Sequence, residues 1–140
     1  MPESILSVKR IKAISFSMDE MLYYAASSLP VKVELQPKLG YQMDANTVEL
    51  TLKVIYLKDS AELMHIQVQN LFELPGLREF PVEDHLLKLP SAIITLIVSL
   101  ALSHTRALLA VNVAGTPLEE VLLAVVDAED VAKRFFPYMF

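Results

Sequence analysis

The stretch from Ala92 to Leu102 constrains the fold of this chain more than any other part of the sequence. Apart from Thr95 and Ser99, every side chain in it is apolar. In the helix that we predict over 91–111, apolar residues recur on more than one face, and a helix that is apolar all round is buried all round. Since one sheet covers only one side of a helix, we expect the same helix of a second copy to cover the other side.

The residues around this stretch predict the ends of the helix and its surroundings. Ser91, directly after Pro90, is the expected N-cap, and Gly115 is the expected stop. A membrane span needs about 20 largely apolar residues. This run ends at Leu102, and Arg106 would lie near the middle of any longer span, which is costly. We therefore expect a buried helix and no membrane span.

The first two thirds of the chain predict β-strands. Apolar and polar residues alternate over 31–36, 48–54 and 64–69, and a period of two is typical of strands with one buried face. A fourth extended segment covers 5–17. Turn residues are expected at three places, 38–40, 44–46 and 58–60.

Two breaks in the alternation predict irregular pairing: a bulge near Ala13 and Ile14, and a bulge or the end of pairing at 70–72. From 74 to 90 the chain mixes prolines with bulky apolar residues, which indicates a crossover from the sheet to the helix. A short helix is expected over 127–136. The sequence thus predicts a single domain over residues 1–140 with an α+β fold: a four-stranded antiparallel sheet packed with one long helix and a short C-terminal helix.

Composition narrows the function. Hydrophobic residues make up 54% of the chain, and in so small a domain the surplus indicates an apolar binding or assembly surface. The net charge of −5 and the scattered basic residues argue against nucleic acid. The absence of cysteine and of a secretory signal pattern predicts a cytoplasmic protein.

Residues that carry chemistry form no catalytic or metal-binding pattern. The histidines, His65, His85 and His104, are too far apart for a His-Glu-x-x-His ligand set, and no Gly-x-Ser-x-Gly elbow surrounds a serine. The glycines are never grouped, so no phosphate-binding loop is present. We therefore expect no metal, no cofactor and no enzymatic activity.

Four segments together suggest a family. They are a basic and hydrophobic stretch that ends in Ile-Ser-Phe (8–16), an alternating strand (48–54), a strand end with Val-Gln, Phe and Gly (68–76), and a long helix followed by Gly-Thr-Pro-Leu (115–118). In order and spacing, over nearly the whole chain, they resemble the SecB family of protein-export chaperones.

The resemblance implies a molecular chaperone of the holdase type, which binds unfolded or precursor polypeptides in apolar grooves. It also implies a homotetramer, a dimer of dimers in which the long helices pack between subunits. The client-binding groove would be lined by Phe72, Leu74, Leu77, Phe80, Leu86 and Leu87. The oligomer interface would include Ile66, Val68, Ile94, Val98 and Leu102.

One family feature is missing. Export-dedicated members carry a C-terminal tail with Cys and His that binds zinc and docks the SecA motor. Here the sequence closes on Phe135-Phe-Pro-Tyr-Met-Phe140 and contains no cysteine. Coupling to SecA is therefore in doubt, and the chain looks closer to solitary SecB-like proteins, some of which are chaperones of toxin–antitoxin pairs.

Two other functions stay open at this point. A hotdog-type acyl-thioester enzyme also wraps a sheet around a long helix, although there the helix usually follows an early strand. A purely structural oligomer would use the apolar surplus in its interfaces alone. An apolar groove that remains open after assembly distinguishes a chaperone from a structural oligomer.

Overall fold

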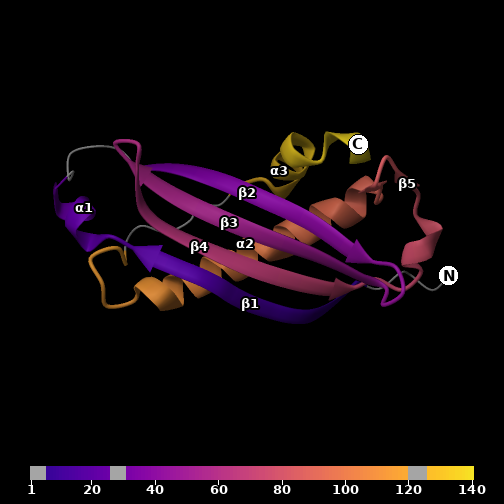
Figure 1. The fold of residues 1–140 in the computed structure, drawn as a ribbon, viewed down its shortest axis with the longest axis horizontal. Helices are drawn as coiled ribbons and strands as arrows, with labels where there is room; N and C mark the ends of the chain where they lie inside the picture. Colours follow the sequence, from indigo (N-terminus) through magenta and orange to yellow (C-terminus); the bar gives the residue numbers. More distant parts are fainter. Residues whose placement is uncertain (1–5, 26–30, 120–125) are drawn as a thin grey trace.

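The computed structural model describes residues 6–25, 31–119 and 126–140. A four-stranded antiparallel sheet forms one layer, in the order β1-β4-β3-β2. The long helix α2 runs diagonally across one face of it (Figure 1). The strands and this helix are β1 (Ser7–Met18), β2 (Val31–Gln42), β3 (Thr47–Lys58), β4 (Ala61–Glu73) and α2 (Ser91–Val113). The smaller elements are α1 (Glu20–Ala25), η1 (Leu77–Glu79), β5 (Val82–Glu83), β6 (Leu86–Leu87), α3 (Ala128–Phe135) and η2 (Pro137–Met139). The predicted α+β fold is confirmed.

The central strands β3 and β4 supply the sheet side of the core. Every second residue of β3 from Val48 to Tyr56 is buried, because the period of two turns those side chains toward the helix layer. The same phase in β4 buries Met64, Ile66 and Phe72. Burial of each such side chain stabilises the fold by about 1.5–3 kcal/mol.

The turns agree with two of the three expectations. Asp59 and Ser60 both have positive φ, 52° and 63°, as a two-residue hairpin between right-twisted strands requires. Asn46, with φ 53°, closes the turn between β2 and β3. The turn expected at 38–40 is wrong, because these residues pair with 49–51 inside the ladder of β2 and β3.

One predicted bulge is present and the other is not. The register between β1 and β4 shifts between Ala13 and Ser15, which leaves Ile14 unopposed as expected. It shifts a second time between Val8 and Arg10, opposite Phe72 and Leu71, with the extra residue, Lys9, on β1 and not on β4. No shift occurs at 70–72 in the pairing of β4 with β3: Asn70 keeps the inward phase and is buried, so the apparent slip in the sequence was a polar residue in the core.

Helix α2 is not buried on all sides. The N-cap is Pro90, whose carbonyl accepts from the backbone N–H groups of Ile93 and Ile94 at 2.9 and 3.1 Å, so Ser91 is the first helical residue and not the cap. The helix ends at Val113, just before Gly115 with φ 76°. The sheet and α3 cover one side of it. The other side is open in the single chain, and the expectation that a second copy covers it stays a prediction.

The C-terminal helix α3 packs against α2. Its N-cap is Asp127, whose carboxylate accepts from the backbone N–H groups of Glu129 and Asp130. Lys133 lies one turn after Glu129 and forms an ion pair with it at 3.2 Å. Acids in the first turn and bases in the last suit the helix dipole, as the sequence indicated.

Candidate functional site

The six residues predicted to line a client groove divide into two groups. Phe72, Leu74, Leu77 and Leu87 are buried in the core of the single chain. Phe80 is half-buried, and Leu86 is 46% exposed. Leu86 and Phe80 are therefore accessible to another polypeptide as the chain stands, while a role for the four buried side chains in client contact stays a prediction that requires them to move.

A small hairpin presents the accessible residues. β5 and β6 pair with Glu83 opposite Leu86, and the turn between them has Asp84 and His85 at positive φ, 52° and 66°. The Lys88 ammonium forms an ion pair with the Glu83 carboxylate at 3.1 Å, and its backbone N–H donates to the Pro81 carbonyl at 2.9 Å. A two-residue turn of this type holds the hairpin in one conformation.

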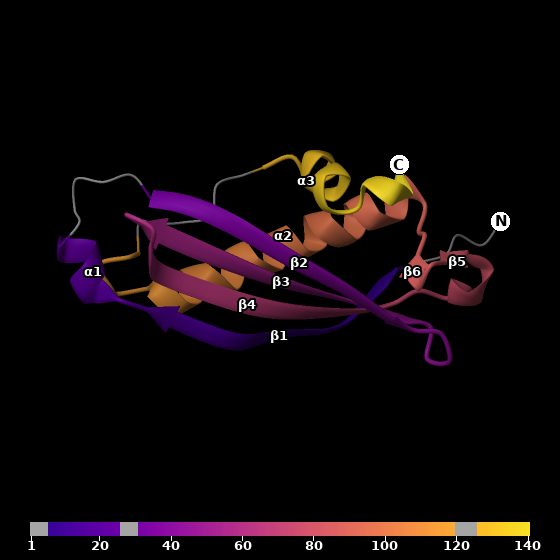
Figure 2. The same cartoon turned by 45° about the horizontal axis from the view of Figure 1, so that its top comes forward.

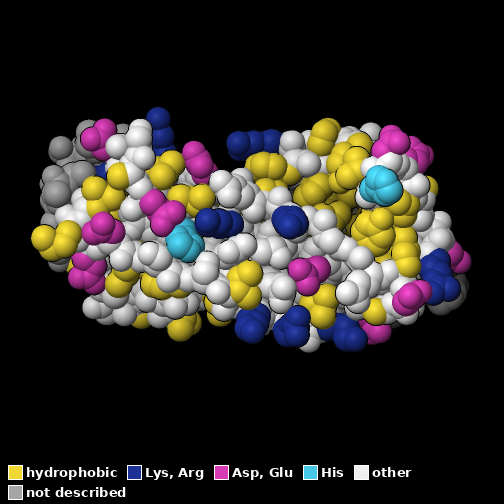
Figure 3. Space-filling model, in the orientation of Figure 1, with side chains coloured by type: hydrophobic (Ala, Val, Ile, Leu, Met, Phe, Trp, Pro, Cys, Tyr) yellow, Lys and Arg dark blue, Asp and Glu magenta, His cyan; other side chains and the backbone are white. Residues whose placement is uncertain are grey.

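The hairpin exposes apolar side chains on both of its faces. Val82 pairs with the buried Leu87 yet is 42% exposed, and Leu86 projects from the opposite face. Figure 3 shows hydrophobic side chains gathered in a hollow beside this hairpin, toward the edge of the sheet. We call Phe80, Val82 and Leu86 the crossover patch. Exposed apolar groups on both faces of one short hairpin make this segment a candidate binding surface.

The five residues predicted for the oligomer interface all lie inside the chain. Ile66 and Val68 face the helix layer from β4, and Ile94, Val98 and Leu102 face the sheet from α2. Their role in assembly remains untested as a prediction. The open side of α2, which we call the outer helix face, carries Leu96 at 47% exposure, Ser99, Ser103 and Val111 at 73% exposure. Its small residues leave room for the close approach of another helix.

A buried polar pair links α2 to β4. The Nδ2 of Asn70 donates to the carbonyls of Leu50 at 3.1 Å and Val68 at 3.4 Å, so its Oδ1 faces the helix as an acceptor. Nδ1 of His104 lies 2.7 Å from that oxygen. Burial lowers the pKa of His104 below its usual value, which favours the neutral ring. The contact gives the buried Asn70 amide oxygen a hydrogen-bond partner and fixes the position of α2 along β4.

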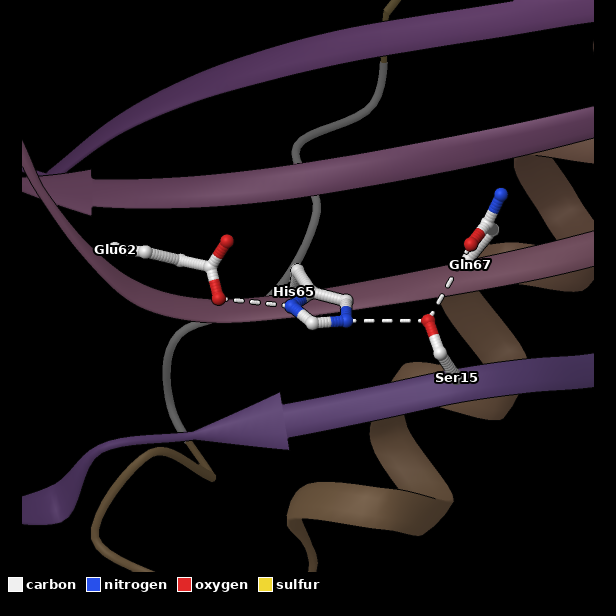
Figure 4. Close-up of polar contacts among 4 residues, drawn as sticks. All are labelled: Ser15, Glu62, His65 and Gln67. Atoms are coloured by element: carbon white, nitrogen blue, oxygen red, sulfur yellow. Dashed lines mark hydrogen bonds and ion pairs between the residues drawn. The ribbon is translucent and has the colours of Figure 1, made fainter.

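A second polar cluster lies on the other face of the sheet. Nδ1 of His65 contacts the Glu62 carboxylate at 2.8 Å, and its Nε2 lies 3.1 Å from the Ser15 hydroxyl (Figure 4). Ser15 also lies 3.4 Å from Oε1 of Gln67. The order carboxylate, imidazole, hydroxyl is that of a serine nucleophile with its base.

The surroundings of this cluster do not complete a catalytic site. Acyl transfer also needs a cavity for substrate and donors for the oxyanion. Of the described residues, those that line the pocket on this face belong to the far end of the strands, and Ser15, Glu62 and His65 are not among them. The cluster ties the edge strand β1 to β4. Sequence reasoning missed it because only the strand register brings Ser15 beside His65.

No group of three or more potential ligand side chains is placed to hold a metal ion in the described part of the chain. Helix α2, at 23 residues, is long and apolar enough by length and composition to cross a membrane. In this fold its inner side packs on the sheet, as in a core helix.

Comparison with known proteins bears on the fold. No family model matches the chain, and no curated protein matches it. A solved structure of a SecB-like chaperone from Mycobacterium tuberculosis, in complex with a ChAD peptide from the antitoxin HigA1, superposes with a TM-score of 0.50. The match covers 86% of this chain and 90% of that chain at 14% sequence identity. The chain has a SecB-like fold.

That likeness bears on the fold alone. The neighbour shares the four-stranded antiparallel sheet with a long helix and a short C-terminal one. It is a chaperone and not an enzyme, and it was solved with a peptide bound.

Proposed function

We propose that this protein is a holdase chaperone that binds non-native polypeptides through the crossover patch. The observation that carries the proposal is the exposure of Val82 and Leu86 on a hairpin of fixed conformation. In the same segment, the leucines at 74, 77 and 87 are buried, with exposed fractions of 0–2%. Val82 and Leu86 remain in solvent although they are equally apolar. The SecB-like fold, whose solved example holds an antitoxin peptide, supports the same function.

Assembly is the second part of the proposal. The chain forms a homo-oligomer, a tetramer built as a dimer of dimers, in which the outer helix face packs against its copy. Leu96 and Val111 are large apolar groups in solvent, and Ser99 and Ser103 between them allow close helix approach. The buried positions Ile94, Val98 and Leu102 support the outer face from behind. In this proposal the inner side of α2 packs on the sheet, and its outer side packs on the second copy.

The clients we propose are unfolded or precursor polypeptides in the cytoplasm. Either protein export or the protection of an antitoxin would use this binding. The proposed protein uses no cofactor, binds no nucleic acid and does not span the membrane.

Suppression of aggregation tests the holdase proposal. A chemically denatured model protein is diluted into buffer with and without the chain, and light scattering is followed. We expect the chain to suppress the increase in scattering. The double variant Val82→Ser, Leu86→Ser should lose most of this suppression, because it removes exposed apolar groups without opening the core.

Met21→Ser is the matched control for that variant. Met21 is 78% exposed and lies on α1, at the other end of the sheet from β5 (Figure 1). It should suppress aggregation as the wild type does. Equal suppression by the double variant and the control would exclude the crossover patch as the client site.

The absence of enzymatic activity is also part of the proposal. If the Ser15–His65–Glu62 cluster only joins strands, Ser15→Ala should hydrolyse an activated ester, p-nitrophenyl acetate, at the wild-type rate. A rate that falls with Ser15→Ala but not with Ser17→Ala would show that the cluster is catalytic.

A further inference from the structure

A pocket of about 530 Å³ lies on the sheet face that points away from α2, near the turn between β2 and β3. Its floor is one row of residues across the sheet: Arg10 pairs with Leu71, Leu71 with Glu49, and Glu49 with Gly40. Leu71 lies between the inward-facing Asn70 and Phe72, so the row faces outward. The volume is in the range of small-molecule sites.

Gly40 keeps the pocket open. It lies inside β2, has no left-handed φ, and a Cβ built on it would meet nothing within 4 Å. Any residue can adopt the backbone conformation found at this position, so a need for positive φ does not explain why the residue is a glycine. Glycine in a strand interior weakens the strand and often marks a place where a ligand approaches the backbone.

The walls come from two separate features of the sheet. On one side the bulge between Val8 and Arg10 places Lys9 and Arg10 at the rim. On the other side lies the turn that follows Gln42, which curls away from α2 at the end of the sheet (Figure 2). Gln69, which does not line the pocket, accepts a 3.1 Å hydrogen bond from Nη2 of Arg10, and the other donors of the guanidinium stay available.

Opposite charges line this pocket without neutralising each other. Lys9 and Arg10 are at one end and Glu49 is on the floor, and in the described part of the chain no ion pair within 4.0 Å joins Glu49 to either of them. Arg10 and Glu49 are separated by the strand that carries Leu71, which places their backbones about 10 Å apart at the usual strand spacing.

We propose that this pocket binds a dipolar molecule of about dipeptide length, with its carboxylate at Lys9 and Arg10 and its ammonium at Glu49. An extended dipeptide spans about 7 Å, which is somewhat less than the separation of about 10 Å between the backbones that carry Arg10 and Glu49. Arg and Lys are the usual partners of a carboxylate. The site shares no residue with the crossover patch, so it is independent of client holding.

Isothermal titration with dialanine tests the proposal. The wild type should bind one dialanine per chain, saturably. N-acetyl-dialanine and dialanine amide, which each lack one charge, should bind at least tenfold more weakly, and free alanine should also bind more weakly because it cannot span the two ends.

Two variants test the same site from the side of the protein. Gly40→Leu fills the pocket and should abolish binding, and Glu49→Gln should weaken dialanine at least tenfold while leaving N-acetyl-dialanine, which has no ammonium, unchanged. Lys12→Gln, on the same strand but outside the pocket, is the matched control and should bind as the wild type does. Circular dichroism confirms that each variant is folded.

The proposal is overturned if the wild type does not saturate with dialanine at millimolar concentration, or if Gly40→Leu or the capped dipeptides bind as tightly. Equal affinity for free alanine would contradict the assigned length. Because suppression of aggregation uses other residues, Gly40→Leu should retain it, which separates failure here from failure of the proposed function.

Discussion

Nδ1 of His104 donates a hydrogen bond of 2.7 Å to Oδ1 of Asn70, and this contact joins the middle of α2 to the inner face of β4. The direction follows from the amide of Asn70, whose nitrogen already donates to the Leu50 carbonyl. A fully buried amide with three partners in an apolar core is costly to disturb, because each partner left behind loses its hydrogen bond.

Asn70→Ala should therefore lower the free energy of unfolding by about 2–3 kcal/mol, through the lost hydrogen bonds and the small cavity. Urea denaturation measures the change. Gln69→Ala, one residue away on the outer face, should change it by about 0.5 kcal/mol or less. Equal effects of the two substitutions would mean that the Asn70–His104 contact is not formed.

Stability should fall in mild acid because of the same pair. Burial lowers the pKa of His104 from its usual value of 6.5, so below that pH the unfolded chain takes up a proton that the folded chain does not. The contribution of His104 to the free energy of unfolding is constant above pH 6.5. It is lost as the pH falls from 6.5 through the pKa of His104 in the folded state. Urea titrations across this range should show a smaller loss for His104→Gln than for the wild type.

Tyr56 offers a contrasting buried polar group. Its hydroxyl is buried and has no hydrogen-bond partner among the described residues, and burial raises its pKa to about 12. Tyr56→Phe removes an unsatisfied group without changing the shape of the core, so stability should stay equal or rise by up to about 1 kcal/mol. A loss of more than about 1 kcal/mol in urea denaturation would indicate a partner that the structure does not show.

The sequence predicted the strands and the long helix because hydrophobic periodicity follows burial directly, as in Val48 to Tyr56. It failed at Asn70, where a polar side chain in the inward phase looked like a change of register. It also failed on Ser91, because a proline carbonyl can start a helix without a side-chain cap.

The site was harder to predict than the fold. Sequence alone could not separate Leu86, which is exposed, from Leu87, which is buried, because the tight turn at Asp84 and His85 decides which face each one takes. In the same way, Val98 and Leu96 are both apolar, and the rotation of α2 about its own axis determines which of them faces the sheet and which is open. Pairing across strands brings together Ser15 and His65, and no local pattern encodes that contact.

Substitutions at Val98 and Leu96 should therefore have different consequences. Val98 is 3% exposed, so Val98→Asp should unfold the chain, at a cost of about 3–5 kcal/mol for an unpaired buried charge. Leu96→Asp should keep the native circular dichroism spectrum and give a smaller particle by light scattering. A Leu96→Asp variant with the mass of the wild type would exclude the outer helix face as the subunit interface, and so would a monomeric wild type.

The most direct test of the chaperone account is to map where an unfolded polypeptide touches the protein. Methyl resonances of the labelled chain are recorded while a permanently unfolded, carboxymethylated protein is added. We expect the largest changes at Val82 and Leu86 in the crossover patch, with little change at Val8 and Ile11 on the exposed edge of β1. Changes concentrated at β1, or no changes at saturating unfolded protein, would contradict it.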